Sequence, residues 1–186
     1  MKLFFGLLLS LCVFPATAQN SLNETLKQQM VKEWERAKAY TQEYLDAMPA
    51  DKYGFRAVDS IRSFAEQMLH LAFANAALVA VGTGVRDSVV QNIFLSRNLE
   101  KSPTAQSKDS VVYYVNTSYD FVFTAIKNMD FGKLSEVVSQ RTPGGNRSET
   151  RLAWLLKAFE HQTHHRGQCT IYIRLLGIRP PGEKLF

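Results

Sequence analysis

The stretch that decides the fold covers residues 149–177 and reads ETRLAWLLKAFEHQTHHRGQCTIYIRLLG. Residues along it recur at alternating steps of four and three, the spacing of the inward face of a packed helix. This predicted seam comprises Trp154, Ala158, His161, His165, Gln168, Tyr172 and Leu175. Gly177, with Pro180 and Pro181 shortly after it, is typical of the end of a helix. The sequence therefore predicts a helix over residues 149–176 with one buried face.

Three further helices are predicted upstream of this one. Ser21 and Glu24 have the spacing of a capping box, and the apolar stripe that they open ends before Pro49. Ser63 and Glu66 repeat that spacing and open a segment that is apolar nearly all round, which predicts a buried helix ending at the turn 82–84. A third helix is expected over residues 110–128. Its apolar side comprises Val111, Val115, Val122, Ile126 and Met129.

The connections complete the prediction of an all-α protein, a four-helix bundle with at least one long connection. That connection spans residues 86–109, and residues 89–95 within it could form a further short helix. Residues 142–146 (Thr-Pro-Gly-Gly-Asn) have turn chemistry and separate the last helix from the third. We expect no strand in competition with the helices.

The composition excludes several classes of protein. The chain has 186 residues, 46% of them hydrophobic and 21% charged, which is typical of one globular domain rather than a disordered chain. Its formal net charge is +5, but no block of five Lys or Arg residues occurs. Because a nucleic-acid footprint gathers on one face, we expect no nucleic-acid binding.

The first 18 residues have the features of a cleavable secretory signal. Lys2 precedes an apolar run over residues 3–14, and Ala16 and Ala18 supply the small-residue cleavage site. The alternative is a retained anchor, for which the apolar run is short. Cleavage after Ala18 would leave residues 19–186 as the mature domain, in the periplasm or secreted, with no stable membrane insertion. It would also remove Cys12, so Cys169 could form no internal disulfide and is expected to be a buried apolar residue.

Three of the four histidines make a candidate metal site. His161 and His165 lie one helical turn apart on the seam, so their rings can converge on one point, and His70 lies on the buried second helix. Three neutral imidazoles with an open fourth position are typical of catalytic zinc. His164 belongs to a different, mostly solvated stripe. The other members of that stripe are Lys157, Glu160, Gly167 and Arg174.

Other interpretations of these residues stay open at this point. Each histidine could instead be a core residue with a satisfied hydrogen bond. The pattern is not the His-Glu-x-x-His of zincin proteases, because position 162 is Gln. Glu66, one turn before His70, could support the metal site as a carboxylate or base, or it could serve only as a helix cap.

The motifs resemble those of a known family. His161-x-x-x-His165 within His-His-Arg-Gly-Gln, followed by residues 172–177 and Pro180-Pro181, is similar to the C-terminal signature of DinB-like (DinB/YfiT) metalloenzymes. Residues 62–71 resemble the second-helix motif of that family. The resemblance covers about residues 22–181. It implies a four-helix bundle, usually a homodimer, that binds a divalent metal through His70, His161 and His165.

The resemblance leaves the reaction open. Some relatives are transferases or isomerases that activate a low-molecular-weight thiol on the metal, but the export signal of this chain places it away from the cytosolic thiol pool. We expect a metal-dependent hydrolase or transferase acting on an unidentified small molecule. The alternative is a non-catalytic bundle that binds a metal or a small ligand. Because imidazole suits all three, zinc, nickel and iron are the candidate metals.

Overall fold

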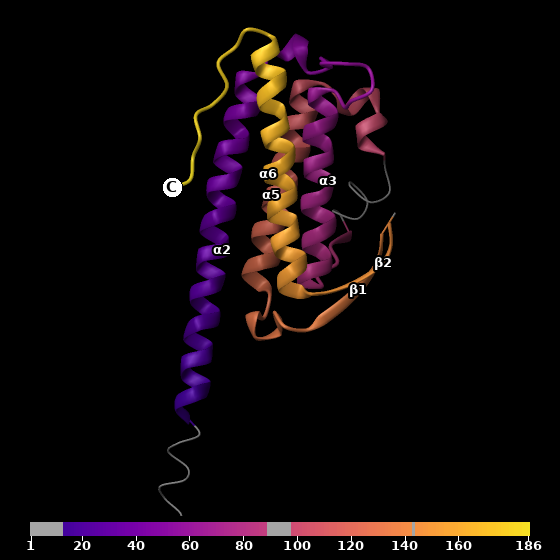
Figure 1. Ribbon diagram of the computed structural model, residues 1–186. Helices are drawn as coiled ribbons and strands as arrows, with labels where there is room; N and C mark the ends of the chain where they lie inside the picture. The colour runs from indigo at the N-terminus through magenta and orange to yellow at the C-terminus, as the bar shows by residue number, and fades with distance from the viewer. Residues whose placement is uncertain (1–12, 89–97, 143) are drawn as a thin grey trace, which may run out of the picture.

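Four long helices lie side by side in the computed structural model, which describes residues 13–88, 98–142 and 144–186 (Figure 1). Helix α3 packs against α6 and α5, and α2 packs against the same two helices from the other side. Their bounds are α2 Val13–Ala47, α3 Phe64–Thr83, α5 Lys108–Asn128 and α6 Arg151–Leu175. The short 3-10 helices are η1 Ala50–Lys52, η3 Leu99–Lys101, η4 Pro103–Ala105 and η5 Phe131–Lys133. The predicted four-helix bundle is confirmed.

Helix α3 is the central helix of the bundle and begins as predicted. The side chain of Ser63 accepts a hydrogen bond from the backbone N–H of Glu66, and the Glu66 carboxylate accepts one from the backbone N–H of Ser63. The helix ends at Gly84, whose φ of +76° is readily adopted only by glycine. By length and composition α3 could cross a membrane, but 67% of its apolar window is buried inside the bundle. Its apolar character is therefore accounted for by packing.

The predicted start of the first helix is wrong. Helix α2 begins at Val13 and passes through Ser21, whose carbonyl accepts a hydrogen bond from the Thr25 hydroxyl at 2.9 Å. In the uncleaved chain, Ser21 is therefore an interior residue of this helix and not its cap. The reason is that residues 16–22 contain no Gly or Pro, so nothing in the sequence interrupts the helix there. Its end at Ala47, two residues before Pro49, agrees with the prediction.

A β-hairpin corrects the expectation that the chain contains no strand. Strand β1 (Val137–Thr142) pairs with β2 (Gly145–Thr150) in antiparallel register, with Val137 opposite Thr150. Most of its residues are exposed, so no alternation of buried and exposed positions signals it in the sequence. The strands extend into the turn expected over 142–146, because Thr142 pairs with Gly145 and Arg141 with Asn146. Because β2 continues through Thr150, α6 begins at Arg151, and the Thr150 side chain accepts from the Ala153 N–H.

The connection between α3 and α5 contains η3, which packs against α3. Leu99 is buried there, and the Gln106 side chain donates to the Glu100 carbonyl at 2.7 Å, which fixes this turn. The helix expected over residues 89–95 lies outside the described residues. Helix α5 then begins two residues earlier than predicted. Its five predicted core residues are all buried, as is Cys169 on α6.

Candidate metal centre

Three imidazoles meet between α3 and α6. His70 comes from the middle of α3, and His161 and His165 come from successive turns of α6. One ring nitrogen of each lies within 4.8 Å of the corresponding nitrogens of the other two. The ring centroids of His161 and His165 are 4.4 Å apart, and that of His70 lies 5.1 Å and 4.6 Å from them. The fold thus gathers the three histidines that the sequence singled out, and they could hold a metal ion.

His70 is oriented by a carboxylate from the long connection. Its Nδ1 lies 2.5 Å from Oε1 of Glu100, and the other oxygen of Glu100 accepts from Nε of Arg62 at 2.8 Å. Burial raises the pKa of Glu100, but hydrogen bonds from His70 and Arg62 outweigh it and lower that pKa to about 2. Because an ionised carboxylate only accepts, Nδ1 of His70 carries the proton. In the neutral ring, Nε2 then keeps a lone pair for a ligand.

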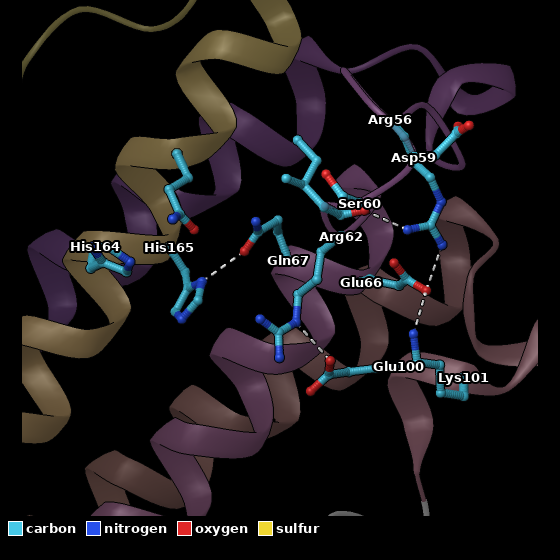
Figure 2. A pocket seen from close by; sticks show the side chains of 12 residues that line it. Arg56, Asp59, Ser60, Arg62, Glu66, Gln67, Glu100, Lys101, His164 and His165 are labelled. Carbon is cyan, nitrogen blue, oxygen red and sulfur yellow. Dashed lines mark hydrogen bonds and ion pairs between the residues drawn. The ribbon is translucent and has the colours of Figure 1, made fainter.

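His165 is oriented by an amide from α3. Its Nδ1 lies 2.7 Å from Oε1 of Gln67, and Figure 2 shows this contact reaching across from α6 to α3. The amide nitrogen of Gln67 contacts the Tyr172 hydroxyl, which in turn donates to the Arg62 carbonyl. These contacts orient the amide so that its oxygen faces the ring. His165 therefore donates through Nδ1 and keeps the lone pair on Nε2.

His161 supplies the observation that best tests whether an ion fits. Its Nδ1 is fully buried and has no hydrogen-bond partner among the described residues. A buried polar atom without a partner costs free energy, and native proteins nearly always avoid this. A ligand bound through Nδ1 of His161 would relieve this cost.

The protonation state of these rings also suits a metal. Burial lowers the pKa of His161 to about 4, aided by the neighbouring His70 and His164. Burial and the adjacent His161 and His70 lower the pKa of His165 to about 3. Both rings are therefore neutral near pH 7, as metal ligands must be. A set of three imidazoles, with no carboxylate in this described cluster, fits zinc, nickel or iron.

The structure confirms some of the other predictions for α6 and contradicts others. His164 is exposed, as expected of its solvated stripe, although its ring lies 4.9 Å from that of His165. Gln168 and Leu175 are exposed, so the predicted seam is wrong at these two positions. A straight α-helix turns every 3.6 residues and drifts away from a 3.5-residue seam. The buried side therefore passes through Gln162, Arg166, Cys169 and Ile173 as well.

Glu66 does not contact His70. Its carboxylate caps the backbone of Ser63 and pairs with Arg56 at 2.7 Å and Lys101 at 3.5 Å. Of its two interpretations, these contacts fit the helix cap. The carboxylate beside the histidines is Glu100, which sequence reasoning missed. No local motif marks it, because it lies 30 residues from His70 within the long connection.

A polar pocket of about 520 Å³ opens beside His165 (Figure 2). It lies between the loop that precedes α3, the start of α3, η3 and α6. Its charged lining residues are Arg56, Asp59, Arg62, Glu66, Glu100 and Lys101. His164 and Gln168 line the α6 side, and Gln67 lines the α3 side. The pocket thus borders the three-histidine cluster at His165 and is large enough for a small organic molecule.

Comparison with known proteins agrees with this geometry. The model of the DinB family matches residues 19–185, nearly the whole chain. No curated protein is significantly similar to the chain in sequence.

Solved structures share the fold at low sequence identity. A DinB-like protein from Bacillus cereus ATCC 10987 has a TM-score of 0.68 and 18% identity, over 84% of this chain and 97% of that one. The DinB-like protein YjoA from Bacillus subtilis has a TM-score of 0.61 and 19% identity, over 85% and 96% of the two chains. A conserved protein from Enterococcus faecalis has a TM-score of 0.63 and 17% identity, over 82% and 98%. These similarities establish the fold alone.

Proposed function

Because the chain belongs to the DinB family, we propose that it is an exported metalloenzyme that holds one divalent ion through His70, His161 and His165. The proposed reaction is a hydrolysis or a group transfer on a small molecule. The observation that carries the proposal is the convergence of three imidazole nitrogens within 4.8 Å beside an open polar pocket. Zinc, nickel and iron are the candidate ions.

The side chains around the cluster have separable roles in this proposal. Glu100 and Gln67 hold the Nδ1 protons of His70 and His165, which fixes both rings and leaves their Nε2 atoms free. When bound, a divalent ion supplies Lewis-acid polarisation of a substrate group or lowers the pKa of water. Arg62 holds Glu100 in place, and the pocket admits the substrate.

The pocket favours an enzyme over a purely structural site. Structural zinc sites have four protein ligands and are closed, whereas catalytic sites keep a position open to substrate. The described cluster offers three histidines, and His165 lies in the wall of a pocket that reaches solvent. The non-catalytic alternative, a metal or ligand binder, predicts metal uptake without turnover.

A turnover screen distinguishes these two functions. The zinc-, nickel- and iron-loaded protein is assayed against panels of esters, amides and phosphoesters, with the His161→Ala variant as the matched control. The proposal expects at least one substrate class to turn over with wild type and not with the variant. Metal uptake without any turnover across the panels would favour the binding function.

Export is proposed from the N-terminal segment. The family match starts at residue 19, directly after the predicted cleavage point at Ala18, and this supports a mature domain over 19–186 in the periplasm or outside the cell. Mass spectrometry of protein recovered from its host should find Gln19 at the N-terminus. An intact Met1 would overturn the proposal.

A homodimer is proposed from the outer face of α6. Leu156 and Ile171 are 56% and 55% exposed, and Gly167 lies between them on the same side of the helix, at about 100° per residue. A Cβ added at Gly167 would meet nothing within 4 Å, so a second helix could approach closely there. Exposed apolar residues along one face support an interface with a second copy.

A further inference from the structure

In the pocket beside the three histidines, two of the three carboxylates, Glu66 and Glu100, are largely buried, whereas the cations Arg62 and Lys101 are accessible to a ligand. Side chains of Arg62 and Lys101 are 39% and 66% exposed, whereas those of Glu66 and Glu100 are only 2% and 19% exposed. Figure 2 shows the contacts of both carboxylates with the neighbouring cations. A molecule entering the pocket therefore has access to guanidinium and ammonium N–H groups, and Asp59 is the exposed carboxylate of the lining.

These carboxylates are already satisfied by the protein. Glu66 accepts from Arg56, the Ser63 N–H and Lys101, so it has little capacity left for a ligand. Glu100 is shared between His70 and Arg62. Arg62 uses Nε on Glu100, and its Nη2 lies near His70, which leaves donors of its planar fork for another acceptor.

The charges of the lining residues also favour an anionic ligand. The three cations of the lining are matched by three carboxylates, those of Glu66 and Glu100 and the exposed one of Asp59. The histidine cluster adds no negative charge to this balance. A divalent ion held by neutral imidazoles would therefore leave the pocket with an uncompensated positive charge of about +2.

Arg62 lies between the charged pocket and the histidine cluster. Nη2 of Arg62 lies 3.4 Å from Nδ1 of His70, so its guanidinium stands beside the histidine cluster. Lys101 follows Glu100 directly in η3 and lines the same pocket.

We propose that this pocket is specific for small organic anions, and that Arg62 and Lys101 bind the carboxylate or phosphate group of the ligand. This inference rests on the proposed function, because it takes the metal ion to be bound. Guanidinium matches the geometry of such oxyanions, and charge-assisted hydrogen bonds are stronger than neutral ones. The substrate class is thereby narrowed to molecules with an oxyanion group at one end and the reacting group at the other.

Binding measurements on the zinc-loaded protein test the proposal. Succinate, inorganic phosphate and the uncharged analogue succinamide are titrated by NMR, and elemental analysis records the zinc content of every sample. We expect succinate or phosphate to bind at least tenfold more tightly than succinamide. The tighter of the two anions then identifies the group that the pocket prefers.

Substitutions in the pocket distinguish anion binding by its side chains from anion binding by the metal ion. Lys101→Met should weaken succinate binding by about threefold, the scale of an exposed ion pair, and Arg62→Met should weaken it by about tenfold. Succinamide binding should stay unchanged in Lys101→Met, and the Arg62→Met measurement is made only on samples whose zinc content equals that of wild type, because Arg62 also holds Glu100. Lys52→Met is the matched control, because Lys52 is an exposed lysine paired with Asp51 outside the pocket.

The outcomes are distinguishable. Equal binding of succinate and succinamide by zinc-loaded protein overturns the anion specificity and leaves the metal site intact. A preference for succinate that survives both substitutions overturns it as well, since the ion alone would then bind the anion. Protein that holds no zinc after reloading overturns the proposed function and this inference together.

Discussion

Oε1 of Glu100 lies 2.5 Å from Nδ1 of His70, across 30 residues of sequence. The contact joins the long connection between α3 and α5 to the histidine cluster. Arg62 holds the other carboxylate oxygen, and Gln106 holds the carbonyl of the same residue. The connection thus supplies the carboxylate that fixes one ring of the cluster, an arrangement that protein metal sites use to orient their histidines.

Loss of this carboxylate should weaken metal binding. Glu100→Gln keeps the shape of the side chain but replaces the ionised acceptor of His70, so zinc affinity should fall by about 10- to 100-fold. Competition with a fluorescent chelator measures the affinity. Glu149→Gln is the control, because Glu149 is a partly exposed carboxylate whose ion pair with Lys157 lies away from the cluster. Equal zinc affinities of the two variants would contradict the role of Glu100.

Acid should destabilise the metal-free protein through its histidines. The pKa values of His161 and His165 are lowered to about 4 and about 3, whereas an unfolded histidine titrates near 6.5. Between pH 6.5 and these values the unfolded chain binds more protons than the folded one, so stability falls as pH falls.

Thermal unfolding of chelator-treated protein measures this effect. The Tm should fall steadily between pH 6.5 and pH 4, and the fall should be shallower in His161→Phe, which removes one of the titrating rings. The pKa of Glu100, lowered to about 2, adds a second loss between about pH 4.5 and pH 2, because its folded-state contacts require the ionised form. A Tm that does not change from pH 7 to pH 4 would contradict the burial of neutral histidines.

The capping box of α3 should contribute measurably to stability. Ser63→Ala removes the acceptor of the Glu66 N–H and should cost about 1 kcal/mol of unfolding free energy. Denaturant titration of the two proteins measures the difference. Ser135→Ala is the matched control, since Ser135 is exposed and lies outside the helices. A loss no larger than that of the control would show that the cap does not stabilise α3.

The proposed dimer makes a separate prediction. Leu156→Lys and Ile171→Lys place charges on the outer face of α6 and should convert a dimer into monomers. Light scattering should give twice the monomer mass for wild type and the monomer mass for both variants. Val137→Lys, at an exposed position of the hairpin, should remain dimeric. A monomeric wild type at tens of micromolar would refute the interface.

The elements that the sequence predicted well are those with a strong local pattern. The capping box at Ser63 and the glycine at position 84 delimit α3 by local hydrogen bonding and backbone conformation, and both act as the sequence suggested. His161 and His165 lie near each other because one helical turn separates them. His70 could be assigned because an apolar helix must be buried against its neighbours.

The features that the sequence did not reveal depend on tertiary contacts. Glu100 approaches His70 only because Leu99 packs in the core and Gln106 fixes the turn. The hairpin was missed because its strands are mostly exposed and carry no buried alternation. At Ser21 the error is of the opposite kind, because a capping pattern is present but no helix begins there. The helix continues through Ser21, so the pattern has no effect.

Metal stoichiometry across the histidine variants tests the central claim most directly. Elemental analysis is made on wild type and on the His70→Ala, His161→Ala, His165→Ala and His164→Ala variants, each reloaded and desalted in the same way. Wild type and His164→Ala should each hold one divalent ion per chain, and the other three should lose it. A wild type that holds no ion, or a His164→Ala variant that loses it as completely as His165→Ala, would contradict the three-histidine site.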